Sequence, residues 1–355
     1  MNFSNLILNW YYNNKRDLPW RKNINPYSVW ISEIILQQTK IDQGLPYYLK
    51  FISKYPNINS LAKATEQDIL ILWQGLGYYS RARNLLKTAK TIVKTLGGKF
   101  PKSQVELKKL DGIGEYTASA ISSICFNERR AVVDGNVYRV ISRFYGIDKP
   151  INSYDGQKYF SEIAQDLAPN KSCGDYNQGI MDFGSLICKP KLPLCMECML
   201  ASNCIAKKSN RIDYFPVKIK RKAPKIVHFN YIVFLDSKYK TYINQIENGI
   251  WKNLFQFPLI ESNKELDKDK IMTNKGLNKL INLENCEIKL FNTKPIVHKL
   301  SHRIIYTKFW ILSIENSNDN SIEFIDIKKY PVPKLIQNFL EKFNYKTFLK
   351  TFSYK

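Results

Sequence analysis

Four cysteines near the middle of the chain are spaced to bind a soft metal centre. Cys188, Cys195, Cys198 and Cys204 form the pattern C-x6-C-x2-C-x5-C. Thiolates this dense can ligate one [4Fe–4S] cluster or one zinc ion. Structural zinc usually uses paired C-x2-C knuckles, and only one such pair is present here. The spacing therefore favours iron–sulfur while leaving zinc open.

A glutamate lies in a segment that predicts a buried helix. Glu33 sits within V-W-I-S-E-I-I-L-Q-Q-T, which is apolar around most of its helical circumference. Desolvation would raise the pKa of this carboxyl and keep a proton available near neutrality, as a general acid requires. The simpler alternative is a carboxylate satisfied by a buried partner.

A second carboxylate, Asp134, lies in A-V-V-D-G-N-V. It could simply cap the helix that begins near Asn136. A cap beside the positive end of a helix dipole stays ionised, so this pattern predicts a depressed pKa. A carboxyl group with a raised pKa would act as a general acid, and one with a depressed pKa would act as an anionic stabiliser. Glycosidic cleavage uses this pair of roles.

Two glycines form a tight turn between helical segments in L-D-G-I-G-E-Y-T-A. Gly112 and Gly114 would let the backbone approach a ligand closely, and the following helix would aim its free N–H groups at a phosphate. This is the helix-hairpin-helix pattern for gripping a DNA backbone. Any tight corner between two helices could use the same turn, so this pattern indicates DNA binding only together with the motifs around it.

The overall charge suits a polyanionic partner. The 54 Lys and Arg residues against 31 Asp and Glu give a formal net charge of +23. Neutralised phosphates release condensed counterions, although a lysine-rich proteome would raise this count everywhere. No run of about 18 apolar residues predicts a membrane span, and the N-terminus lacks signal-peptide features. We expect a cytoplasmic bacterial protein whose thiols stay reduced.

The elements that must position these residues fall into two predicted domains. An all-α domain, 1–206, includes the cysteine loop 188–204, and a basic linker follows over 207–225. Helices are predicted over 28–38, 43–55, 66–73, 79–96, 103–110, 115–125 and 136–145. A smaller α+β domain, 226–355, has strands predicted over 226–235, 239–246, 254–260 and 303–314, with a closing helix over 332–350.

Together these motifs resemble the helix-hairpin-helix DNA glycosylase superfamily, and most closely its adenine DNA glycosylase (MutY) branch. The resemblance covers nearly the whole chain, with the second domain similar to that branch's Nudix-like domain. The matching motifs occur in order: L-P-W-R ending at Arg21, V-W-I-S-E-I-I-L-Q-Q-T, G-L-G-Y-Y-S-R-A-R-N-L from Gly75, L-D-G-I-G-E-Y-T-A, V-D-G-N-V and the four cysteines.

The resemblance implies a role for each matching residue. Glu33 would protonate adenine, Asp134 would stabilise the oxocarbenium-like sugar, and Tyr116 and Asn136 would support them. Other residues would contact the DNA bases: Gln38 and Tyr78 as wedges beside an extruded base, and Trp20 and Arg21 in the adenine pocket. Each has a simpler alternative: Trp20 in the core, Arg21 as a solvated cation, Tyr78 in packing. The resemblance also implies one [4Fe–4S] cluster.

Position 116 separates two related activities. The endonuclease III branch resembles this chain in its hairpin and cluster but carries a nucleophilic lysine where Tyr116 stands. Lysine forms the Schiff base that leads to strand cleavage, and tyrosine cannot. We therefore expect a monofunctional hydrolase acting as a monomer on duplex DNA with A·8-oxoguanine or A·G mispairs. The alternatives are an endonuclease III-like lyase and an iron–sulfur DNA-binding protein without activity.

The second domain carries a candidate lesion-reading turn. The branch typically has Phe-Ser-His here, whereas this chain has Leu300, Ser301 and His302. Compared with that motif, this chain keeps the hydroxyl of Ser301 and the imidazole of His302 and has Leu300 in place of the aromatic ring. His302 could alternatively cap the turn. No Nudix hydrolase motif occurs, so the resemblance implies recognition rather than pyrophosphate hydrolysis.

Overall fold

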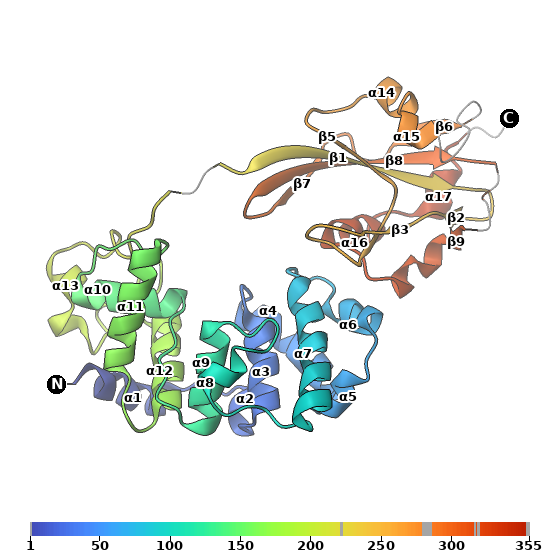
Figure 1. The fold of residues 1–355 in the computed structure, drawn as a ribbon. Helices are drawn as coiled ribbons and strands as arrows, with labels where there is room; N and C mark the ends of the chain where they lie inside the picture. The colour runs from blue at the N-terminus through green and yellow to red at the C-terminus, as the bar shows by residue number, and fades with distance from the viewer. Residues whose placement is uncertain (1, 221–222, 279–285, 316, 318–319, 353–355) are drawn as a thin grey trace. The chain divides into compact units, whose positions relative to one another are not determined.

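The computed structural model describes residues 2–220, 223–278, 286–315, 317 and 320–352. The chain divides into two compact units. The first contains Met1–Ala64 and Asn84–Arg221, and the second contains Thr65–Arg83 and Lys222–Lys355. Figure 1 shows helices throughout the first unit and a sheet with helices in the second. In the described part of the chain, no helix combines the length and apolar character needed to cross a bilayer.

The first unit is built from helices, which agrees with the predicted all-α class. Their starts follow local signals: Asn25 caps α3 by accepting a hydrogen bond from Ser28 N (2.9 Å), with Pro26 at the first helical position. The helices are α1 (Phe3–Asn14), α2 (Pro19–Lys22), α3 (Pro26–Leu36), α4 (Ile41–Lys54), α5 (Ile58–Ala62), α7 (Ser80–Leu96, entered from the second unit), α8 (Gln104–Leu107), α9 (Glu115–Phe126), α10 (Gly135–Tyr145), α11 (Tyr154–Leu167), α12 (Cys173–Leu186), η1 (Ala201–Asn203) and α13 (Ile205–Lys208).

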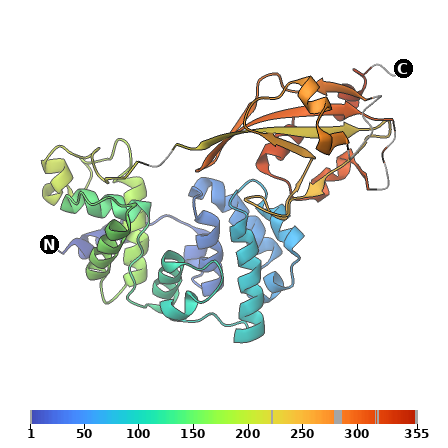
Figure 2. The same cartoon turned by 45° about the horizontal axis from the view of Figure 1, so that its top comes forward.

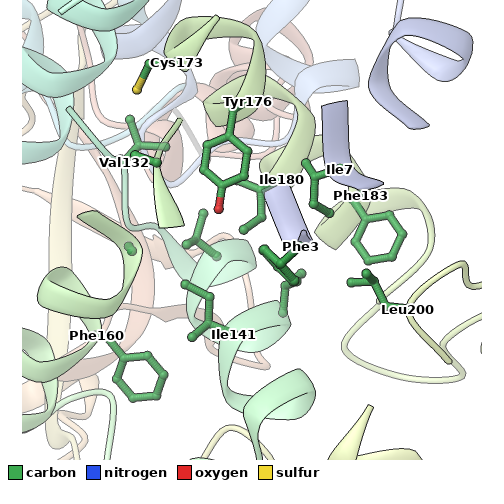
Figure 3. Packing of buried hydrophobic residues seen from close by; sticks show 14 of the residues in the cluster. Phe3, Ile7, Val132, Ile141, Phe160, Cys173, Tyr176, Ile180, Phe183 and Leu200 are labelled. Carbon is green, nitrogen blue, oxygen red and sulfur yellow. The ribbon is translucent and has the colours of Figure 1, made fainter. Parts of the chain in front are cut away.

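Helix α12 is the centre of the first unit. It packs against α1, α9 and α10, and its side chains Tyr176, Ile180 and Phe183 are almost fully buried (Figure 3). Two of its glycines permit close helix contact: a Cβ on Gly174 would lie 2.7 Å from Ile124 Cα, and one on Gly184 would lie 2.7 Å from Asn136 Cβ. In the hydrophobic core around α12, backbone atoms as well as side chains therefore form close packing contacts.

The second unit contains a mixed sheet. Strands β1 (Lys225–Leu235) and β8 (Arg303–Ser313) pair in parallel along their whole length, and the sheet order is β5-β1-β8-β6, with β7 also paired to β8. Figure 2 shows β1 and β8 as the long central strands. The other elements are α6 (Glu66–Trp73), β2 (Lys240–Thr241), β3 (Asn244–Gln245), β4 (Phe255–Gln256), β5 (Leu259–Ser262), α14 (Lys268–Met272), α15 (Lys275–Asn278), β6 (Glu287–Leu290), β7 (Ile296–Lys299), β9 (Ile322–Glu323), η2 (Phe324–Lys329), α16 (Lys334–Leu340) and α17 (Tyr345–Leu349).

Both faces of this sheet are covered by apolar side chains. On one face Trp310 packs with Ile271 and Leu277 of α14 and α15. On the other, Phe309 stacks on Phe339 of α16 with ring centroids 4.0 Å apart. Successive side chains of a strand point to opposite faces of the sheet, so alternating residues of β1 and β8 pack into two separate cores.

Several predicted elements differ from the observed ones. The long strands predicted over 226–235 and 303–314 correspond to β1 and β8. The strand predicted over 239–246 is wrong as a single element, because only β2 and β3 form there. The strand predicted over 254–260 is divided into β4 and β5 at Pro258, which cannot donate to a sheet. The closing helix, 332–350, is two short helices. In the first unit, the predicted ranges leave out α1, α2, α5, α11, α12 and α13.

The predicted linker is partly anchored to the first unit. Arg143 Nε donates to the carbonyls of Ile212 (3.1 Å) and Phe215 (3.2 Å). Ile151 N donates to Val217 O at 3.0 Å. Residues 211–217 are thus held by the Arg143 side chain and the Ile151 backbone, and the basic segment is not extended along its whole predicted length.

The close contact at Gly174 predicts a large stability effect of a small substitution. Gly174→Ala would place a methyl group against the backbone of Ser123 and Ile124, which cannot move cheaply. We expect a loss of roughly 1–3 kcal/mol in unfolding free energy, measured by urea denaturation. Gly135→Ala is the matched control, because its Cβ would meet no atom within 4 Å. A Gly174→Ala protein as stable as this control would contradict the packing argument.

Candidate active site

A cavity of about 160 Å³ lies in the first unit and is lined by all four predicted catalytic residues, Glu33, Tyr116, Asp134 and Asn136. Water occupies about 30 Å³ of liquid volume per molecule, so the cavity has room for a group several times larger. Its walls come from α2, α3, α9, α10 and α12. The lining side chains are Arg16, Leu18, Trp20, Arg21, Val29, Glu33, Leu36, Thr39, Ile41, Tyr116, Ile124, Asp134, Asn136, Gln178, Met181 and Asp182.

Glu33 lies on α3 and faces this cavity. Burial raises the pKa of its carboxyl to about 7, and the Asp134 charge acts in the same direction. A hydrogen bond with Tyr116 acts the other way and does not cancel the effect of burial. At neutral pH a substantial fraction of Glu33 therefore carries a proton, as the buried helix predicts.

Asp134 is the N-cap of α10, and both of its carboxylate oxygens are used. Oδ1 accepts from Asn136 N (2.8 Å) and Val137 N (2.8 Å), and Oδ2 accepts from Asn136 Nδ2 (2.7 Å). The expected depressed pKa is wrong, because burial raises the pKa of Asp134 and outweighs these hydrogen bonds and Arg139. Asp134 therefore caps α10 and also lines the cavity.

Tyr116 lies near the start of α9 and meets Glu33 across the cavity. Its hydroxyl is within hydrogen-bond reach of the Glu33 carboxyl and 3.2 Å from Met181 Sδ. Burial raises the pKa of Tyr116 well above its ordinary value. The phenol thus stays neutral and can donate a proton in a hydrogen bond without carrying charge.

Trp20 and Arg21 also line the cavity. Trp20 is buried, with its ring centroid 4.9 Å from that of Tyr48 in an edge contact. Arg21 is not the solvated cation of the simpler alternative: its Nη1 and Nη2 donate to Asp182 at 2.7 and 3.0 Å. Arg16 donates to the same carboxylate, whose side chain is fully buried. Two cations therefore compensate one buried anion at the cavity wall.

Sequence reasoning missed the contribution of α12 to this cavity. Gln178 and Asp182 are one helical turn apart and point into it, with Met181 beside them. A signal existed in the sequence, because the polar residues Gln178 and Asp182 are spaced i, i+4 and so lie on one face of a helix. The partners of Asp182, Arg16 and Arg21, lie far away in sequence, so this pairing could not be predicted from the local sequence.

Arg139 connects Asn136 to the cysteine loop. Its guanidinium donates to Asn136 Oδ1 (2.8 Å), Gly184 O (2.6 Å) and Cys188 O (2.7 Å). Arg143, one turn later, donates to Cys188 Sγ at 3.5 Å and to Lys189 O at 2.7 Å. The amide that supports Asp134 is thus fixed to the start of the cysteine loop by a buried arginine.

The four predicted cysteine ligands surround one small apolar cavity of about 30 Å³, together with Ile187, Leu194 and Arg143. Among the described residues, no three His, Cys, Asp or Glu side chains are placed to hold a single ion. Four thiols around one apolar cavity are the soft donor set that a [4Fe–4S] cluster or a zinc ion uses.

The two glycines of the hairpin stand in different structural surroundings. Gly112 has φ of +73°, and a Cβ there would lie 2.6 Å from Asn84 Cβ, so the fold itself requires glycine. Gly114 is the N-cap of α9, and its Cβ would meet no protein atom within 4 Å. The space beside Gly114 is open to a ligand at the start of a 12-residue helix.

Gln38 and Tyr78 both occupy left-handed backbone that non-glycine residues rarely adopt. Gln38 has φ of +57° directly after α3, and Tyr78 has φ of +48° in the second unit. Both are exposed, and the Tyr78 side chain is 57% exposed rather than packed as the simpler alternative requires. Such strain persists where the surrounding structure enforces it, often at functional positions.

The predicted lesion-reading turn joins β7 to β8 in the second unit. Ser301 and His302 are exposed, with the Ser301 hydroxyl 3.5 Å from His302 Nδ1. Lys225 N donates to His302 O at 3.0 Å, and Leu300 N donates to Arg303 O at 2.8 Å. The turn is capped by backbone groups, which leaves the hydroxyl and imidazole directed to solvent.

Comparisons with known proteins relate the chain to base excision DNA repair proteins. Residues 31–167 match the HhH-GPD superfamily of base excision DNA repair proteins. An adenine DNA glycosylase from Buchnera aphidicola subsp. Schizaphis graminum (strain Sg) is 38% identical over 354 residues, covering 96% of this chain and 98% of that relative.

Two solved structures share the fold of the helical part. A thermostable thymine-DNA glycosylase has a TM-score of 0.54 and 32% identity, and it covers 58% of this chain and 95% of its own. Endonuclease III in a non-covalent DNA complex has a TM-score of 0.51 over 58% of this chain and 94% of its own. At 20% identity this second likeness concerns the fold alone.

The raised pKa of Glu33 predicts a pH-dependent stability difference. The folded pKa of about 7 lies above the unfolded value of roughly 4.3, so the stability from Glu33 is present below pH 4 and lost as pH rises to 7. Glu33→Gln should therefore raise the unfolding free energy at pH 8 by up to about 3 kcal/mol, and much less at pH 4. Urea denaturation at both pH values measures this.

The surface variant Glu247→Gln is the control, with no comparable pH dependence expected at an exposed position. A Glu33→Gln protein that gained nothing between pH 4 and pH 8 would show that the carboxyl is not desolvated.

Proposed function

The chain belongs to the adenine DNA glycosylase family, a group of base-excision repair enzymes in the HhH-GPD superfamily, and we propose that it hydrolyses the N-glycosidic bond of adenine mispaired with 8-oxoguanine or guanine in duplex DNA. One observation carries the proposal: a single cavity holds Glu33, with a pKa of about 7, together with Asp134 and Tyr116. An acid that is half protonated at neutral pH can both give and recover a proton.

In the proposed reaction Glu33 donates its proton to a ring nitrogen of the extruded adenine. The C1′–N9 bond then breaks, and its electron pair leaves with the base. Asp134 stabilises the positive charge that develops on the sugar, and water adds at C1′ while its proton returns to Glu33. Asn136 keeps Asp134 oriented through the 2.7 Å hydrogen bond. The products are adenine and an abasic site.

Tyr116 supports a hydrolase without lyase activity. The reaction of a lyase needs an amine at the sugar carbon, and the cavity has a neutral phenol at this position. Trp20 offers a flat apolar surface to the base, while Arg21 is held by Asp182 beside it. These contacts would select a planar heterocycle that has been rotated out of the duplex.

DNA binding is proposed for three separate features. The hairpin at Gly112 and Gly114 would accept a backbone phosphate at the start of α9. Gln38 and Tyr78, exposed on strained backbone, would insert where the adenine leaves the stack. Ser301 and His302 would read the partner base from the second domain, which we propose to be Nudix-like.

The proposed cofactor is one [4Fe–4S] cluster held by Cys188, Cys195, Cys198 and Cys204. When bound, it would act as a structural and electrostatic unit with no part in hydrolysis. Arg143 would stabilise the thiolate of Cys188 through its 3.5 Å contact. Lys207 lines the same cavity and could direct positive charge toward phosphates.

The central experiment is single-turnover excision on a duplex with adenine opposite 8-oxoguanine. Wild type should give strands that break only after alkali treatment. Glu33→Gln keeps the side-chain shape and loses the acid, so its rate should fall at least ~10²-fold. DNA affinity should persist, because it comes mainly from phosphates. Breakage without alkali would indicate a lyase, and no excision by wild type would indicate a binding protein.

The cluster assignment predicts iron in the purified protein. A Cys₄ [4Fe–4S] cluster requires about four irons and a brown colour. Cys198→Ser should lower iron content and soluble yield more than it changes the excision rate of the protein that folds. Cys125→Ser serves as the control cysteine outside the cavity. Stoichiometric zinc in protein expressed with ample iron would rule out this cofactor.

The exposed Ser301–His302 turn predicts a loss of substrate preference. Changing both residues to alanine should reduce the preference for 8-oxoguanine·A over G·A by about 1–3 kcal/mol, because paired polar contacts are lost. Excision from G·A should change much less. Rates and binding on both duplexes are compared with Val297→Ala, a neighbouring exposed residue on β7. An unchanged preference in a folded double mutant would place recognition elsewhere.

A further inference from the structure

Within the second unit, the helical segment Thr65–Arg83 is hydrogen-bonded to loops 169 to 262 residues away in sequence. We call these contacts the polar seam. It consists of Asn253 Nδ2 to Glu66 Oε1, Arg83 Nη1 to Lys252 O (2.9 Å), Gln67 Nε2 to Lys329 O (3.1 Å) and Tyr79 OH to Val332 O (3.4 Å).

The polar seam leads directly to the turn that displays Tyr78. Gly75 N donates to the Tyr79 hydroxyl at 3.3 Å, and that hydroxyl donates to Val332 O. Gly75, Gly77 and Tyr78 have φ of +98°, +73° and +48°, so three of the four residues 75–78 occupy left-handed backbone. Within the segment, Trp73 Nε1 and Arg81 Nη2 donate to Gly77 O at 3.1 and 3.2 Å, and the Tyr79–Val332 hydrogen bond ties the turn to a second chain segment.

The same seam reaches the lesion-reading turn through the loop 249–253. The buried Trp251 ring lies 6.0 Å from the His298 ring, and β7, which carries His298, runs into Leu300. At the end of this loop Asn253 has φ of +68°, and its N donates to Ile246 O at 2.7 Å. One short loop thus contacts both the strand before Ser301 and the helix before Tyr78.

We propose that Asn253 is a positioning residue that holds Tyr78 for insertion into the duplex, so that base extrusion depends on the second domain. This inference rests on the proposed function, because it assumes that adenine is extruded. Extrusion costs a few kcal/mol of stacking and pairing. A wedge can offset that cost only if its own backbone is held, and the polar seam supplies that restraint across two chain segments.

The inference can be tested in the full-length protein by exchanging the hydrogen-bond donor and acceptor of the Asn253–Glu66 pair. Asn253→Asp places two carboxylates together and should break the contact. Glu66→Gln keeps an oxygen that accepts from Asn253 and should behave as wild type. In the double variant Glu66→Gln/Asn253→Asp, the new amide donates to the new carboxylate and should restore the contact.

The readout is single-turnover excision from two duplexes, one with adenine paired opposite 8-oxoguanine and one with adenine as an unpaired bulge. Asn253→Asp should be about tenfold slower on the paired duplex and nearly unchanged on the bulge, where less extrusion work is needed. Tyr78→Ala should show the same pattern. Combining Asn253→Asp with Tyr78→Ala should cause no further loss, because both act on one step.

Three results for Asn253→Asp would overturn the inference: a wild-type rate on the paired duplex, equal losses on both duplexes, or a loss that multiplies with that of Tyr78→Ala. Equal losses would indicate a structural role only. Failure of the proposed function is distinguishable, because wild type would then excise adenine from neither duplex. A wild-type rate for Tyr78→Ala would instead remove the wedge role and this inference with it.

Discussion

The capping of α10 by Asp134 is the constraint on which the first unit's cavity depends. Two backbone N–H groups and the Asn136 amide converge on this carboxylate, so its position is fixed by the helix rather than by side-chain packing. Asn136 is in turn bonded to Arg139, and Arg139 to Gly184 and Cys188. Moving the cap would therefore disturb α12 and the cysteine loop together.

Helix α12 meets two competing demands. It must approach α9 and α10 closely, which its glycines permit, and it must carry a buried carboxylate beside the cavity. Isolated burial of Asp182 would cost several kcal/mol. Arg16, in the segment after α1, and Arg21 of α2 offset that cost, so the buried carboxylate is paired before any ligand enters.

The sequence predicts those parts of the site that lie within one segment. The apolar surroundings of Glu33, the cap at Asp134 and the cysteine spacing are local patterns, and each led to the observed position. Asp182 and Arg139 escaped prediction because their roles depend on partners from other helices. The pKa of Asp134 was misjudged for the same reason: the cap is visible in the sequence, whereas the protein mass that desolvates it is tertiary. The short strands after 239 depend on pairing with distant residues such as Ile322.

Burial raises the pKa of both Glu33 and Asp134, and the charge on Asp134 raises that of Glu33 further. Two carboxylates in this cavity thus resist being ionised together. A positive charge between them would reverse this, since it attracts both anions and lowers both pKa values. The sugar in the proposed reaction acquires such a charge only as the glycosidic bond breaks. The empty cavity thus disfavours ionising both carboxylates, whereas the positively charged transition state of the proposed reaction would favour it, which is the condition for electrostatic catalysis.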